Sequence, residues 1–238
     1  MIRTETDIEE CRRLWERFSP QQDAWDDWNL MAAFHDPDNH RFNFLVHHSS
    51  DGRADGLVPL VEDTQKNRFM LMGGSYPDGR VLWLRNQDFP EIFERLPDRT
   101  VFFDLKQCWV ADLLQLHPQF DGNFSEPDLR YFLAPSEFDF DFQKHLDTFP
   151  AEKKQKFLYD LRNIGKREPA LRWSGEDEAE LFIELVNRNF GAASDYADEE
   201  NTKELRRVIA ELERSGRLKT LTIEVDGTRQ AVSLSLLH

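Results

Sequence analysis

Apolar side chains recur at three- and four-residue steps in two stretches near the start of the chain. The first stretch predicts a helix over Asp7 to Phe18, with an apolar stripe of Ile8, Cys11, Leu14, Trp15 and Phe18. The second predicts a helix near Trp25 to Phe34, and Pro37 follows it where a helix should end. Both helices are therefore expected to bury one face against a core.

Runs rich in β-branched and aromatic residues alternate with further helical stretches. The expected strands are Met1–Thr4, Phe42–His47, Leu57–Val61, Phe69–Met72, Val81–Leu84, Thr100–Leu105 and Arg130–Ala134. Helices are expected at Phe89–Leu96 and Trp109–His117. Strands that alternate with helices favour an α/β sheet covered by helices.

One order of elements, a short strand, two helices and a hairpin, occurs twice along the chain. Its second occurrence consists of Leu171–Trp173, Glu176–Phe190, Asp198–Arg214, Leu218–Val225 and Gln230–Leu237. The turn at Asp226-Gly227 corresponds to Asp51-Gly52 in the first occurrence. Such self-similarity predicts duplicated domains. We therefore expect a first domain over residues 1–150 and the N-terminal part of a second over residues 151–238.

The chain is acidic, with 30 Lys and Arg residues against 45 Asp and Glu residues and a net charge of −15. This charge disfavours general coating of nucleic-acid phosphates, so nucleic acid is not the expected partner. Apolar runs are too short to span a membrane, and Cys11 and Cys108 have neither metal-ligand nor redox spacing. The expected location is the reducing cytoplasm. The histidines and aspartates from His35 to His48 lack a compact ligand pattern, so no metal site is expected.

Residues 153–172 form a positive stretch in this acidic chain. Pro150 is expected to open a helix here, with Phe157, Leu161 and Ile164 buried along one side. The basic residues of this helix include Lys153, Lys154 and Arg162. Two interpretations stay open: a solvated helix face, or an electrostatic site for an anionic substrate or a phosphate-bearing cofactor.

Several stretches resemble a known enzyme family. They are Phe44-Leu45-Val46, Gly56-Leu57-Val58-Pro59-Leu60, Phe69-Met70-Leu71-Met72-Gly73-Gly74 with Asp78, the basic helix Lys153–Arg162, and Leu218–Leu237. In their order they resemble the tandem GNAT-like domains of the FemAB-like group, which includes the BioF2-like acetyltransferase domains. The resemblance implies an α/β (α+β) fold: a GNAT-like mixed sheet flanked by helices, duplicated, with its second copy incomplete.

The same resemblance implies a function. Proteins of this group transfer an acyl group from acyl-CoA, or in some relatives from aminoacyl-tRNA, to a small-molecule or peptide amine; tRNA is a partner only by this analogy. On this hypothesis the second domain holds the acyl donor and the acceptor lies between the domains. Tyr76 and Asp78 lie in a loop at strand ends, where functional residues concentrate, and are expected to orient the acceptor. Lys153, Lys154 and Arg162 would attract the anion or cofactor. A general base, expected to be a carboxylate, is required but has no signature in the sequence.

A rival interpretation is a non-catalytic binding or scaffold protein with a degenerate GNAT-like fold. The pyrophosphate loop of GNAT proteins has a pattern resembling Gln/Arg-x-x-Gly-x-Gly/Ala, which the chain lacks. Its nearest counterpart, Gly73–Gly79, contains Pro77, which removes an N–H donor. In the second copy the corresponding loop would follow His238.

The 238-residue chain alone is therefore expected not to bind acetyl-CoA tightly. Charge-assisted hydrogen bonds from a pyrophosphate loop are worth roughly 1.5–3 kcal/mol each, so loss of a few removes most of a micromolar affinity. Residual attraction to the basic helix should be weak and should fall with added salt. Calorimetric titration of the purified chain with acetyl-CoA at physiological salt measures the affinity. A dissociation constant in the low micromolar range or tighter, or measurable transfer of the acetyl group from acetyl-CoA to any amine, would contradict the expectation.

Overall fold

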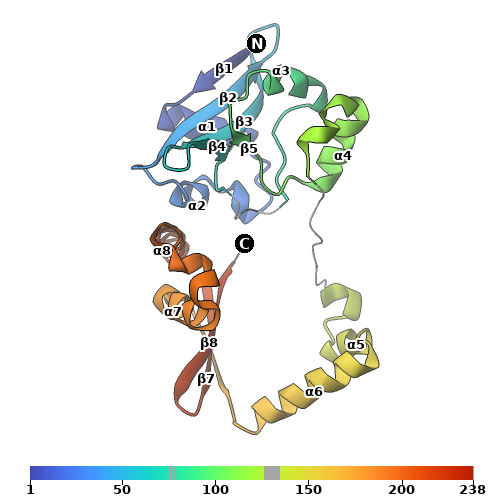
Figure 1. Ribbon diagram of the computed structural model, residues 1–238, viewed down its shortest axis with the longest axis vertical. Coiled ribbons are helices and arrows are strands. Elements are labelled where there is room, and N and C mark those ends of the chain that lie inside the picture. Colours follow the sequence, from blue (N-terminus) through green and yellow to red (C-terminus); the bar gives the residue numbers. More distant parts are fainter. Residues whose placement is uncertain (75–76, 78, 126–134, 238) are drawn as a thin grey trace.

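The computed structural model describes residues 1–74, 77, 79–125 and 135–237, and Figure 1 shows two sheets in separate halves of the molecule. We call residues 1–125 the first half and residues 135–237 the second half. The strands are β1 (Ile2–Glu5), β2 (His40–His48), β3 (Ala54–Asp63), β4 (Arg68–Leu71), β5 (Thr100–Val101), β6 (Ala170–Ser174), β7 (Leu218–Val225) and β8 (Thr228–Leu236). The α-helices are α1 (Ile8–Phe18), α2 (Trp28–Ala33), α3 (Phe89–Phe93), α4 (Gln107–Leu116), α5 (Phe142–Asp147), α6 (Ala151–Gly165), α7 (Ala179–Phe190) and α8 (Glu199–Arg214). Short 3₁₀ turns are η1 (Ala24–Asp26), η2 (Asn86–Asp88), η3 (Pro118–Asn123), η4 (Pro135–Phe138), η5 (Gly191–Ala193) and η6 (Asp195–Ala197).

The sheet of the first half has the strand order β1-β2-β3-β4-β5. Strands β1 to β4 pair antiparallel, and β5 pairs parallel with β4, so the sheet is mixed. Helices α1 and α2 pack on one face, against Phe42, Phe44 and Val46. Helices α3 and α4 pack on the other, where Leu45 and Val58 lie. Alternate residues of β2 therefore serve two cores, and the expected mixture of strands and helices is confirmed.

The two cysteines have opposite environments. Cys11 is fully buried on α1, whereas Cys108 on α4 is exposed. Burial, reinforced by the nearby Glu5, Asp7 and Glu10 carboxylates, raises the pKa of the Cys11 thiol to about 12. Cys11 is therefore a small core residue rather than a nucleophile.

The sheet of the second half is antiparallel, in the order β6-β7-β8, and helices α7 and α8 pack on one of its faces. On β7 the residues of that face, Leu218, Thr220 and Thr222, are buried. On the other face Leu221 and Ile223 of β7 are only half-buried. Leu171 and Trp173 of β6 lie there with 61% and 65% of their surface exposed. The second sheet therefore has a core on one side only.

Each half contains the same order of elements. The order β1-α1-α2-β2-β3 in the first half recurs as β6-α7-α8-β7-β8 in the second, with the same antiparallel pairing. The turn at Asp226-Gly227 connects β7 to β8, as the sequence predicts. Duplication of one ancestral unit stays a prediction, since order and pairing alone do not establish common descent.

Three predicted elements differ in the structure. The helix predicted near Trp25 to Phe34 is divided into η1 and α2, because the Asp27 side chain accepts from the N–H of Leu30 (2.9 Å) and caps a new helix. The strand predicted at Val81–Leu84 makes only an isolated bridge between Leu57 and Trp83, because the N–H of Leu84 bonds back to the carbonyl of Leu82. The strand predicted at Thr100–Leu105 is reduced to β5, since Asp104 has a φ of 53°. The strand predicted at Arg130–Ala134 lies outside the described residues.

Helix α6 forms where the sequence predicts it, but its apolar side is not buried. Phe157, Leu161 and Ile164 are 38%, 41% and 50% exposed, so the prediction of their burial was wrong. Figure 1 shows α5 and α6 set apart from both sheets. The Phe157 ring has aromatic neighbours only in Phe142 and Phe149 among the described residues.

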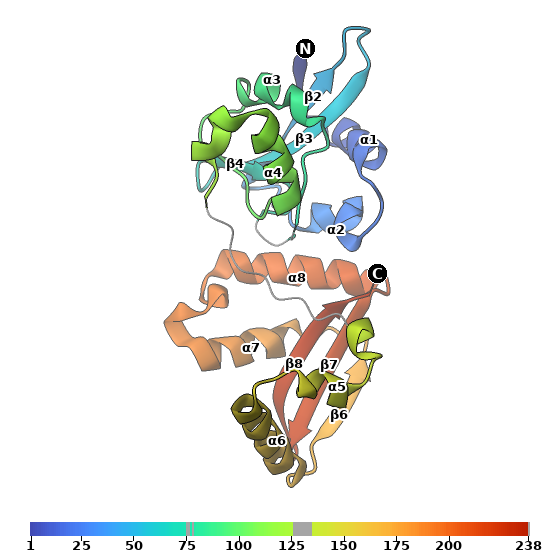
Figure 2. The same ribbon diagram turned by 90° about the vertical axis from the view of Figure 1, so that its right-hand side faces the viewer.

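The two halves meet where α8 packs against α2, as Figures 1 and 2 both show. Val208, Ile209 and Leu212 of α8 join the core cluster that contains Met31 of α2. Polar contacts border this apolar packing: Arg207 Nε donates to the carbonyl of Ala33 (3.1 Å), and Arg217 Nη1 lies 3.5 Å from Asp27 Oδ2. We call this contact the α2–α8 seam. Within the described residues, no helix is both long and apolar enough to cross a membrane.

Truncation of a seam residue should destabilise the protein strongly. Leu212 is 5% exposed, so Leu212→Ala should lower the free energy of unfolding by about 2–5 kcal/mol through lost burial and the cavity it leaves. Leu161→Ala, the same change on the exposed side of α6, should cost within about 0.5 kcal/mol. Urea unfolding of both variants measures the difference. Equal destabilisation by the two changes would show that α6 is packed in solution.

Candidate functional site

A cleft of about 390 Å³ lies between the two halves. One wall comes from β2, β3, β4 and the segments that follow β3 and β4, and the other from η6 and α8. The cleft is rich in charged and polar groups. Its lining residues are His40, Asp63, Lys66, Arg68, Met70, Gly74, Asp195, Tyr196, Glu200, Asn201, Glu204 and Arg207.

Helix α8 presents its charged residues to the cleft because of their helical spacing. Asp198 caps the helix by accepting from the N–H of Glu200 (2.8 Å). Glu200, Glu204 and Arg207 then follow at steps of four and three residues, which places them along one face. This face borders the apolar stripe that forms the α2–α8 seam. Packing of the stripe therefore fixes where the charges lie.

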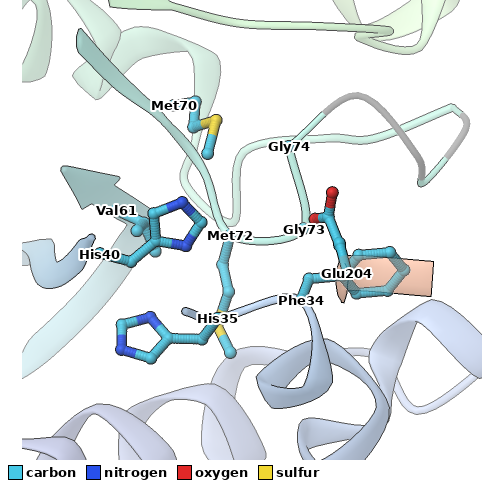
Figure 3. A pocket seen from close by; sticks show the side chains of 9 residues that line it. All are labelled: Phe34, His35, His40, Val61, Met70, Met72, Gly73, Gly74 and Glu204. Carbon is cyan, nitrogen blue, oxygen red and sulfur yellow. The ribbon is translucent and has the colours of Figure 1, made fainter. Parts of the chain in front are cut away.

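Glu204 is the carboxyl most affected by this packing. It also lines a smaller pocket with Phe34, Met70, Met72 and Gly73, shown in Figure 3. There the carboxyl points toward the Gly73–Gly74 segment. No described residue donates a hydrogen bond to it. Burial raises its pKa to about 7, and this desolvation outweighs the opposing attraction of Arg207 and Lys66.

Gly73 lines the smaller pocket in a backbone conformation that favours glycine. Its φ of 92° lies in the left-handed region that glycine adopts without strain. A Cβ on this residue would meet the flexible end of Met31 and crowd the ring of Pro77. A side chain at position 73 would therefore be strained.

Two histidines lie across the smaller pocket from Glu204 (Figure 3). His40 Nδ1 accepts from the N–H of Asp36 (3.1 Å), so the neutral ring carries its proton on Nε2. Burial lowers the pKa of His40, and it lowers that of His35 to about 4 with help from His40. His35 stacks on Phe42 with a centroid distance of 4.2 Å. Both rings are therefore neutral at pH 7.

Most other charges of the cleft are paired within the protein. Lys66 Nζ lies 3.5 Å from Glu200 Oε2, and Arg68 Nε lies 3.5 Å from Asp63 Oδ2. The Arg68 guanidinium also lies over the Phe103 ring, 5.4 Å from its centroid. Arg207 is different: its Nε is held by Ala33, but neither Nη donates to any residue that the structure describes.

This arrangement suits proton transfer at neutral pH. A carboxyl with a pKa near 7 is present in both protonation states there, so it can accept and return a proton. Its desolvated position in a cleft is the setting in which perturbed carboxyls are most often functional. No group of three or more His, Cys, Asp or Glu side chains in the described part of the chain could hold a metal ion.

The residues proposed from the sequence lie elsewhere or outside the description. Tyr76 and Asp78 are not among the described residues, although the adjoining Gly74 lines the cleft. Lys153, Lys154 and Arg162 lie on α6, which contributes no residue to the cleft lining. Lys154 pairs with Asp147 of α5, and Arg162 Nε donates to the carbonyl of Leu158 (3.1 Å). Their proposed role stays a prediction.

Glu204 and Arg207 were not identified from the sequence. They stand in a strongly charged stretch, Glu199–Arg214, that resembles a solvated helix face. The available signal was their position beside the apolar stripe of Val208 and Leu212. That signal becomes informative only when the partner surface on the first half is known.

The chain matches no protein-family model and no curated protein sequence. The geometry of the cleft is therefore the ground for a functional proposal.

Protonation of Glu204 should make stability depend on pH. Its pKa is about 4.5 unfolded and about 7 folded, so the stability that Glu204 contributes is fully present below pH 4.5 and is lost as pH rises to about 7. Once pH exceeds 7, the free energy of unfolding has lost roughly 3 kcal/mol relative to pH below 4.5 through this group. Glu204→Gln imitates the neutral acid and should escape this loss. Its unfolding free energy relative to wild type should rise from near zero at acidic pH to roughly 3 kcal/mol at about pH 8.

Urea unfolding of both proteins at several pH values measures this difference. Glu213→Gln, an exposed change near the end of α8, is the control for the substitution itself. A difference between Glu204→Gln and wild type that does not change with pH would mean that Glu204 is not desolvated.

Proposed function

We propose that the chain carries the acceptor site of an N-acyltransferase, which transfers an acyl group from acyl-CoA or aminoacyl-tRNA to an amine. The observation that supports this most directly is the desolvated Glu204 carboxyl in a polar cleft between the two halves. The FemAB-like resemblance requires an acceptor between its domains and a carboxylate base. Glu204 is a carboxyl that lines the cleft between the halves, which supports its assignment as this base.

In the proposed reaction the amine attacks the carbonyl carbon of an acyl thioester. A C–N bond forms, the C–S bond breaks, and the thiolate leaves and takes up a proton from solvent. The attacking nitrogen passes its excess proton to Glu204, which then releases it to water. A base with a pKa near 7 suits this step because a large fraction of it is ionised at neutral pH, while it is still basic enough to accept the proton.

The acyl donor belongs to the second domain in this proposal, as the resemblance implies. The acceptor is assigned to the cleft between the halves, whose wall on the first half includes Met70 and Gly74.

The domain division belongs to the same proposal. We assign residues 1–150 to a first GNAT-like domain and 151–238 to the N-terminal part of a second. The recurrence of one order of elements in the two halves supports this assignment. Tyr76 and Asp78 remain candidates for orienting the acceptor, and Lys153, Lys154 and Arg162 for attracting the donor.

Acyl transfer should depend on Glu204 and on pH. A small acyl thioester, S-acetyl-N-acetylcysteamine, needs no pyrophosphate loop and can be supplied at millimolar concentration. Amide formation with a panel of amines, followed by mass spectrometry, should fall by about 10²–10⁴-fold in Glu204→Gln. The wild-type rate should decrease as pH falls below about 7, because protonated Glu204 cannot accept a proton.

Glu213→Gln is the matched control, since it makes the same change at an exposed position of α8. It should transfer at the wild-type rate. Transfer that is unaffected by Glu204→Gln would remove Glu204 from the mechanism. Absence of transfer to every amine would instead favour the binding or scaffold protein.

A further inference from the structure

The cleft contains an acidic and a basic side chain, Glu204 and Arg207, for which the described residues provide no ion pair within 4 Å. Lys66 faces Glu200, and Arg68 faces Asp63, so these four charges largely offset one another. Glu204 accepts no hydrogen bond from the described residues, and the two Nη groups of Arg207 donate none to them. The Glu204 carboxyl and the Nη groups of Arg207 can therefore form hydrogen bonds with a ligand.

Glu204 and Arg207 are also well placed to hold a single small molecule. Three residues apart on one helix face, their Cβ atoms are about 5–6 Å from each other. Arg207 is oriented by its Nε bond to Ala33, which directs the remaining donors without using them. The surroundings of the pair restrict water, because Phe34 and Met70 line the pocket beside Glu204. Charged interactions are stronger in such a site than in bulk water.

These charges discriminate between ligand classes. A simple amine beside Glu204 would bring a second positive charge close to Arg207. A simple carboxylate on Arg207 would bring a second negative charge close to Glu204. A ligand with both groups satisfies both side chains, and a guanidinium suits a carboxylate because its parallel N–H groups match the two oxygens.

We propose that the acceptor is a zwitterionic amino acid, with its amine at Glu204 and its carboxylate on the Nη groups of Arg207. This inference rests on the proposed function for the fate of the amine, but binding of the zwitterion is independent of acyl transfer. Before transfer, ionised Glu204 takes one proton from the bound ammonium and releases it to water, so that the neutral amine attacks and later passes its second proton to the same carboxylate. A cleft of about 390 Å³ is large enough for an amino acid with its side chain.

The test is a binding panel without any acyl donor. The purified chain is titrated by calorimetry with each standard L-amino acid, and then with the amine and the acid that each lack one charged group, such as ethylamine and propionate for L-alanine. At least one amino acid should bind, and removal of either group should weaken binding by about tenfold or more. Failure of every amino acid to bind, or equal binding of the amine analogue, would overturn the proposal.

Substitution of Arg207 separates its role from general packing. Arg207→Met should weaken binding of the amino acid by about tenfold or more, without weakening binding of the decarboxylated amine. Arg206→Met is the matched control, because Arg206 pairs with Glu180 outside the cleft. If Arg207→Met does not fold, Arg207→Lys, which keeps the charge but loses the planar fork, replaces it and should show the same selectivity.

The outcomes distinguish the two proposals. An amino acid that binds but is never acylated would contradict the acyltransferase and leave the zwitterion site intact. Acyl transfer to amines with no preference for a carboxylate would contradict the zwitterion site and leave the acyltransferase intact.

Discussion

Packing of α8 on α2 is the contact on which the arrangement of the cleft depends. Val208, Ile209 and Leu212 are buried in a cluster that also contains side chains of the first half. Each such side chain contributes roughly 1.5–3 kcal/mol when fully buried. The same packing carries the charged flank of α8 toward β2, β3 and β4, where Glu204 loses much of its water. Association of the halves and the raised pKa of Glu204 thus have one cause.

The two sheets differ in how much of their surface they bury. The first has helices on both faces, and its strands β2 and β3 carry apolar residues on both sides. The second has helices on one face, and Leu171 and Trp173 lie on the other, open to solvent. The second sheet therefore buries less of its surface than the first.

Periodicity in the sequence predicted the long elements well, because a buried stripe or an alternating run is a local property. The sequence thus indicated α1, α8 and the β7–β8 hairpin. It overextended the strand that ends as β5, where Asp104 turns the backbone, and joined η1 to α2 across the capping residue Asp27. The exposure of the apolar side of α6 and the raised pKa of Glu204 could not be predicted from the sequence, since each depends on what lies opposite the helix in space. A charged residue beside an apolar stripe is exposed or desolvated according to its neighbour in space.

Because one cysteine is buried and the other is exposed, alkylation of the two thiols can measure local opening of the core. Alkylating reagents attack thiolates, so exposed Cys108 is available in every folded molecule, whereas Cys11 combines full burial with a pKa of about 12. Alkylation of Cys108 proceeds in the folded protein, whereas alkylation of Cys11 requires local opening of the core around α1. When closing is faster than labelling, the ratio of the two alkylation rates reports the free energy of that local opening in native buffer, without denaturant.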